Sequence, residues 1–272
     1  MFAKLLKQEW KATSGMLGIL SLGSLGVSLL VTGLMRFESA DIAGVPEIVW
    51  IPVGLMIFAG FLAILAYSAG VQIMLIARFY KNKFTDEGYL TFTLPVTTHQ
   101  ILLSSLLNYL IWTLISAVVT VTSFVIPLAL GISGGGIFNN DVWNVLSAAF
   151  RLMLQEEGVS SYLTLVLVSS VISVLASMML IHTAVAMGAV LAKKHKILAA
   201  FGCYYGFSMV LSVVSSVLTF GVGITSVGIQ TQAEVFGMMN GMIIVQMVVY
   251  AAVAVVGYFL SHHLMKNKLN LP

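Results

Sequence analysis

Residues 163–191 read LTLVLVSSVISVLASMMLIHTAVAMGAVL, a stretch that contains no Asp, Glu, Lys or Arg. An α-helix needs about 20 mostly apolar residues to cross the ~30 Å hydrocarbon core of a bilayer. This stretch is long enough and apolar enough to do so. It therefore predicts a transmembrane helix over 163–191.

Five similar stretches, each bounded by charged residues, lie elsewhere in the chain. They place further spans at 15–35, 51–77, 101–131, 198–220 and 241–264. Of the 272 residues, 59% are hydrophobic and 8% are charged. The charged share is about a third of that of a soluble protein. We therefore expect an all-α, polytopic membrane protein with six transmembrane helices in one domain, 1–272, and exclude a soluble enzyme.

Basic residues gather on one side of the predicted spans. Most of the 13 Lys and Arg residues fall in the two terminal segments and in the loops that follow the second and fourth spans. These residues are Lys4, Lys7, Lys11, Arg78, Lys81, Lys83, Lys193, Lys194, Lys196, Lys266 and Lys268. Because cytoplasmic segments carry an excess of Lys and Arg, we predict that both termini are cytoplasmic.

The first 13 residues have the pattern of an interfacial helix. On a helix, Lys4, Lys7 and Lys11 fall on one side, opposite an apolar side that includes Trp10. We expect an N-terminal interfacial elbow helix over 1–13, with Trp10 at headgroup depth and the lysines toward anionic lipid or a partner. Glu9 lies within the apolar side, where it could face a partner or extend to the headgroups.

Motifs for enzymatic chemistry are missing from the sequence. It contains no G-x-x-x-x-G-K-[ST] phosphate-binding loop, so any ATPase must be another chain. The G-x-S-x-G match at 131–135 is interpreted as a turn in a Gly-rich segment. The single cysteine, Cys203, leaves no intrachain disulfide and no Cys-based metal cluster. We predict no enzyme, no metal and no cofactor in this chain, and no nucleic-acid partner because no long basic face exists.

A few polar residues within the predicted spans are candidates for lining a pathway. His182 is interpreted either as lining it or as donating a hydrogen bond to a neighbouring helix. Ser208 and Ser212 follow an i, i+4 spacing in the fifth span, and Gln246 lies in the sixth. Close helix packing is one explanation of such residues, and a hydroxyl-lined translocation surface is the other.

Two longer segments are predicted on the side opposite the termini. Apolar residues recur with helical spacing in 131–160, which we expect to lie in the membrane interface. The Gly-rich segment 220–238 is too apolar for a plain loop.

The loop 78–99 reads RFYKNKFTDEGYLTFTLPVTTH and concentrates acidic and aromatic residues. Residues 85–87 have the composition of a helix N-terminus. Tyr89, Leu90 and Phe92 would expose apolar surface unless something covers them. The membrane interface and a docked cytoplasmic partner are the two explanations.

Three parts of this loop, 78–80, 84–89 and 93–97, resemble permease subunits of the type-two family of ATP-binding-cassette exporters, in its bacterial branch. The six spans and the expected elbow helix match the same family. The resemblance implies that a coupling helix in this loop inserts into a separately encoded ATPase. The residues implied as ATPase contacts are Phe84, Thr85, Asp86, Glu87, Tyr89, Leu90 and Phe92. The elbow-helix residues implied to border the same partner are Lys4, Lys7, Glu9, Trp10 and Lys11.

The same resemblance implies the partners and the function. The implied partners are a cytoplasmic ATPase dimer that binds ATP and Mg²⁺, a second permease subunit, identical or paralogous, and membrane lipids. The implied function is export of an amphipathic drug, peptide or lipid-like substrate across a bacterial plasma membrane, with an outer hairpin at 220–238. A membrane scaffold or sensor that binds a cytoplasmic partner through the 78–99 loop is the alternative.

Overall fold

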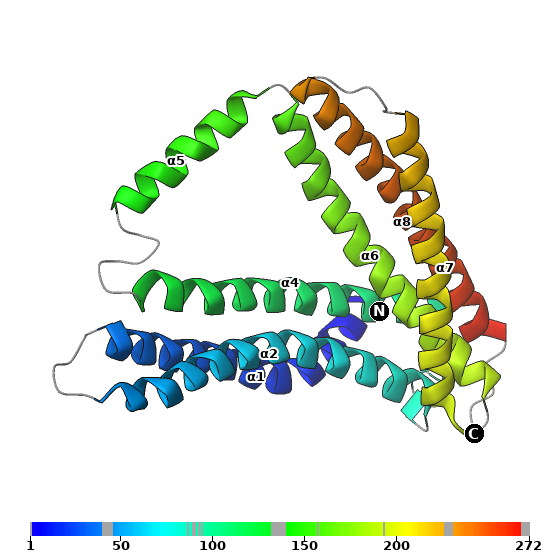
Figure 1. Ribbon diagram of the computed structural model, residues 1–272. Coiled ribbons are helices and arrows are strands. Elements are labelled where there is room, and N and C mark those ends of the chain that lie inside the picture. The colour runs from blue at the N-terminus through cyan, green and yellow to red at the C-terminus, as the bar shows by residue number, and fades with distance from the viewer. Residues whose placement is uncertain are drawn as a thin grey trace. The chain divides into compact units, whose positions relative to one another are not determined.

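The computed structural model describes residues 2–39, 46–85, 87–88, 91, 93, 95–131, 140–156, 158–192, 194–225 and 231–267. Within these ranges the chain forms seven α-helices and one short 3-10 helix (Figure 1). Their bounds are α1 Phe2–Ser39, η1 Glu47–Val49, α2 Trp50–Phe84, α4 Thr98–Leu130, α5 Asn140–Gln155, α6 Val159–Leu191, α7 Lys196–Thr225 and α8 Gln232–Asn267. The all-α prediction is confirmed for this part of the chain.

Six of the described helices are long and apolar enough to cross a membrane: α1, α2, α4, α6, α7 and α8. Each overlaps one predicted span, which indicates a multi-pass membrane protein. The helices extend beyond the predicted apolar segments; α2 continues past residue 77 to Phe84. Lys, Arg and aromatic residues are compatible with a helix, so the end of an apolar segment is not the end of the helix.

Residues 2–13 of the predicted elbow segment are part of α1, which runs without a break from Phe2 to Ser39. A separate elbow helix is therefore not supported. Residues 2–13 contain no Gly or Pro and consist largely of good helix formers, so nothing in the sequence ends a helix before the span begins. The cytoplasmic position of both termini stays a prediction.

The two predicted outer segments are described in part. The helical spacing expected within 131–160 corresponds to α5, Asn140–Gln155. In 220–238, the described residues are the end of α7 and the start of α8, and 226–230 lie outside the described residues. The interfacial position of α5 and the outer hairpin stay predictions.

The chain divides into two compact units, and the first comprises 1–75 and 107–149. In this unit small and hydroxyl side chains bring helices close together. Ser28 Oγ in α1 donates to the carbonyl oxygen of Ser123 in α4 over 2.8 Å. A Cβ at Gly60 of α2 would lie only 2.2 Å from Val31 Cγ2 of α1. Such contacts are typical of membrane helices, where small residues let two backbones approach.

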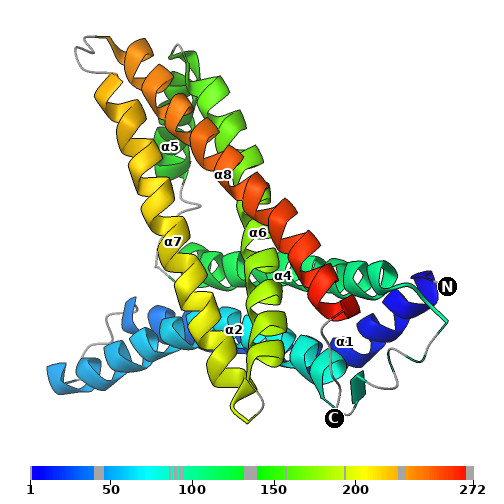
Figure 2. The same cartoon turned by 90° about the vertical axis from the view of Figure 1, so that its right-hand side faces the viewer.

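The second unit comprises 76–106 and 150–272, and in it α6, α7 and α8 lie side by side (Figures 1 and 2). Thr183 Oγ1 of α6 lies 3.0 Å from the carbonyl oxygen of Gly257 and 2.9 Å from Ser261 Oγ, both in α8. Hydroxyl groups therefore join α6 to α8.

The second unit has a buried apolar cluster where four helices meet, which we call the loop core. Its members are Phe79 and Phe84 of α2, Ile101 and Leu102 of α4, Val185 and Ala186 of α6, and Met265 of α8. The loop core lies beside the connection between α2 and α4. It therefore attaches both ends of that connection to α6 and α8.

Candidate functional site

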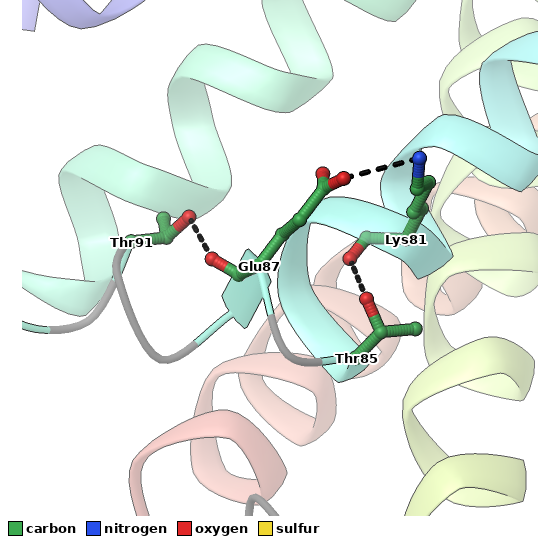
Figure 3. A network of polar contacts seen from close by, with 4 residues as sticks. All are labelled: Lys81, Thr85, Glu87 and Thr91. Carbon is green, nitrogen blue, oxygen red and sulfur yellow. Dashed lines mark hydrogen bonds and ion pairs between the residues drawn. The ribbon is translucent and has the colours of Figure 1, made fainter.

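The loop between α2 and α4 folds back onto the end of α2 (Figure 3). Thr85 Oγ1 donates to the carbonyl oxygen of Lys81 over 2.5 Å. Thr91 Oγ1 lies 3.1 Å from the carbonyl oxygen of Asn82 and 3.3 Å from that of Glu87. The Glu87 carboxylate reaches back to Lys81 Nζ at 3.1 Å. These contacts give the described part of the loop a defined conformation.

The start of the loop is anchored by Phe84, the last residue of α2. Its side chain is only 2% exposed, and its ring meets the ring of Phe79 with centroids 5.7 Å apart. Phe79 in turn packs against His182 of α6, with ring centroids 4.0 Å apart. Phe84 is buried among these side chains, and its contact with an ATPase stays a prediction. Phe84 fastens the loop to the helices beneath it.

The end of the loop is anchored on α8. A capping box opens α4: the Thr97 N–H donates to Gln100 Oε1 over 3.3 Å, and the Gln100 N–H donates to Thr97 Oγ1 over 3.4 Å. His99 Nδ1 then lies 3.0 Å from the Tyr258 hydroxyl. The His99 ring also stacks on His262, with centroids 3.7 Å apart.

The remaining predicted ATPase contacts differ in their surroundings. Thr85 is half-buried, and the Glu87 side chain is 50% exposed, so Glu87 is accessible to a partner. The others lie outside the described residues: Asp86, Tyr89, Leu90 and Phe92. Their role as contacts stays a prediction.

The predicted elbow residues divide into an exposed set and a packed set. The exposed residues are Lys4, Lys7 and Lys11. Trp10 stacks on Trp112 of α4, with ring centroids 4.9 Å apart and an angle of 19° between the rings. Glu9 is buried in the same unit, and the two explanations of its position, a partner and the headgroups, stay predictions. This part of α1 is therefore a packed helix with one charged side.

A groove of about 880 Å³ opens between α6, α7 and α8. Three of the four candidate pathway residues line it: Ser208, Ser212 and Gln246. His182 does not line it. Its side chain is 1% exposed, and Nδ1 donates to the carbonyl oxygen of Met178 over 2.6 Å, within its own helix. The predicted hydrogen bond from His182 to a neighbouring helix stays a prediction.

Two hydroxyl residues of α7 that line the groove were not predicted from the sequence. Ser215 and Thr219 line the groove together with the two predicted serines of that helix. The positions 208, 212, 215 and 219 are separated by four, three and four residues, the spacing of one helix face. Counting in steps of four from Ser208 reaches Ser212 and Ser216 and omits Ser215. Ser215 nevertheless lies on the same face, because it is seven residues after Ser208.

Among the described residues, no group of three His, Cys, Asp or Glu side chains is placed to hold a metal ion. Comparison with known proteins finds no matching protein family, no similar curated protein and no similar solved structure.

Proposed function

We propose that this chain is the membrane-spanning subunit of an ATP-driven exporter of the type-two ATP-binding-cassette family in a bacterial plasma membrane. A separate cytoplasmic ATPase dimer supplies the energy from ATP and Mg²⁺. A second permease subunit, identical or paralogous, completes the pathway for an amphipathic substrate.

One observation carries this proposal: the 78–99 loop is fastened at both ends to helices that line the groove. Phe84 reaches α6 through Phe79 and His182, and His99 contacts Tyr258 of α8. Close-packed interiors transmit displacement because side chains have no free space to absorb it. A partner that moves the loop would therefore move α6 and α8, and with them the walls of the groove.

The chemistry of the groove supports an external source of energy. Among the described residues that line it, there is no Asp, Glu, Lys, Arg or His. Ion-coupled carriers typically keep such a group at the substrate pathway inside the membrane. A groove lined by hydroxyls and one amide offers no comparable site for a coupling ion.

The test co-expresses and co-purifies this chain with the separately encoded ATPase that the proposal requires. Changing Tyr89 and Leu90 together to Asp should weaken association about 30-fold, the effect of losing an interfacial anchor. Lys194→Glu, an exposed charge reversal in the connection between α6 and α7, is the control and should leave association unchanged. Equal recovery of the ATPase with the double variant and the control would refute the proposed coupling.

A further inference from the structure

The groove between α6, α7 and α8 continues into a second, apolar part of about 620 Å³. Leu180 and Leu211 line both parts, so the two adjoin. The first part carries seven Ser and Thr hydroxyls, the Gln246 amide and two Tyr side chains. The second is lined almost entirely by aliphatic residues, among them Val210 and Val253. A part that carries hydroxyl groups, which we call the polar part, therefore adjoins a part that is almost entirely aliphatic, the apolar part.

One hydroxyl in the polar part is left without a hydrogen bond. Ser215 is 9% exposed, and its Oγ has no partner among the described residues. Ser173 and Ser177, which line the same part, donate to carbonyl oxygens of their own helix over 2.8 Å. Burying a hydroxyl without a partner costs free energy, and nearly all buried polar groups have one. Ser215 is thus placed to bind a polar group that enters the groove.

The lining restricts the charge of that polar group. Neither part of the groove includes a described Asp, Glu, Lys, Arg or His. A charged headgroup held there would lose its hydration without gaining a counter-ion, which is costly in a low-dielectric site. A hydroxyl, ester or amide headgroup has no such penalty and can accept or donate hydrogen bonds with Ser215, Ser212 and Gln246.

The apolar part has the dimensions of a single chain. It follows α8 from Val248 to Leu260, about 18 Å along the helix at ~1.5 Å per residue. Val210 and Val214 of α7 line the same part. An aliphatic groove of this length can hold one extended alkyl or acyl chain.

We propose that the two-part groove binds a single-chain amphiphile with an uncharged, hydrogen-bonding headgroup. The headgroup lies at Ser215, and the chain lies between α7 and α8. This inference rests on the proposed function, whose substrate class it names. Binding is measured without an ATPase, so that its failure and the failure of the transport proposal are distinguishable.

The probe is a monoacylglycerol with a photoactivatable diazirine in its chain, added to the purified full chain in phosphatidylcholine nanodiscs. Mass spectrometry of the irradiated protein should place cross-links within 207–214 and 248–260. The matched fatty acid, ionised at pH 8, has the same chain without a neutral headgroup. It should label these segments at least about five-fold less, the effect of one lost hydrogen bond or more. Equal labelling by the two probes would overturn the proposal.

Variants test the two parts of the groove separately. Ser215→Ala should weaken monoacylglycerol labelling about five-fold. Ser170→Ala is the matched control, because Ser170 lies on α6 outside the groove and donates to Leu167 of its own helix. Val249→Phe fills the apolar part and should abolish labelling there. Unchanged labelling of the Ser215 variant would overturn the proposal. Labelling without ATP-driven export would count against the proposed function alone.

Discussion

His182 of α6 and Phe79 of α2 pack edge to face, with ring centroids 4.0 Å apart. His182 also donates from Nδ1 to the carbonyl oxygen of Met178. The pair ties the loop core to the helix bundle of the second unit. His182 therefore packs beside the loop core, through its contact with Phe79.

Phe79→Ala should lower the stability of the protein markedly. Removing a buried Phe leaves a cavity and costs about 3–5 kcal/mol. Phe201→Ala is the control, because Phe201 is 59% exposed on α7. Thermal unfolding in detergent is followed with a fluorescent dye that does not react with thiols. The midpoint temperature of unfolding should fall strongly for Phe79→Ala and only slightly for Phe201→Ala. Equal losses would mean that the loop core does not hold the unit together.

Gly188→Leu should prevent α6 and α7 from packing. A Cβ at Gly188 would lie 2.3 Å from the backbone nitrogen of Ala200, and backbone cannot move aside cheaply. Gly202 of α7 has open space around the corresponding position, so Gly202→Leu is the matched control. Size-exclusion chromatography should show aggregated Gly188→Leu protein and monodisperse Gly202→Leu protein. A monodisperse Gly188 variant would contradict the close approach of the two helices.

Cysteine labelling tests the predicted topology. Cys203 is the only cysteine, so Cys203→Ser provides a background without thiols. Lys194→Cys and Thr231→Cys then place single exposed thiols shortly before α7 and directly before α8, respectively. A membrane-impermeant maleimide should label Thr231→Cys in intact cells, and Lys194→Cys only after lysis, because basic loops remain cytoplasmic. The reverse pattern would invert the topology and remove the loop from the cytoplasm.

Glu87→Gln and Lys81→Gln separate structure from partner binding. The ion pair that these side chains form is exposed, so either change should alter stability by less than about 1 kcal/mol. If Glu87 contacts the ATPase, Glu87→Gln should reduce ATPase association and Lys81→Gln should not. The stability of both variants is measured by thermal unfolding, and their association with the ATPase is measured by co-purification. Equal effects of the two variants on association would assign the role to the pair, and not to Glu87.

The candidate site was predictable in part. The helical face spacing brought Ser208 and Ser212 together, and Gln246 of α8 joins them in the groove. Spacing within one helix could not show that His182 turns toward Phe79, because the two side chains are about a hundred residues apart in the chain. It also could not show that Ser215 lacks a partner, since that depends on what the neighbouring helices present.

The sequence by itself determined that the chain is all-helical with six segments able to cross a membrane. Inside hydrocarbon, backbone N–H and C=O groups must be bonded within the segment, so a long neutral apolar stretch has to be a helix. Only the tertiary structure decided that Phe84 is buried, that Glu9 faces the packed interior and that Ser215 opens into a groove. The physical reason is that lipid is as apolar as the interior of the bundle, so hydrophobic pattern does not distinguish the packed face of a helix from its lipid-facing side.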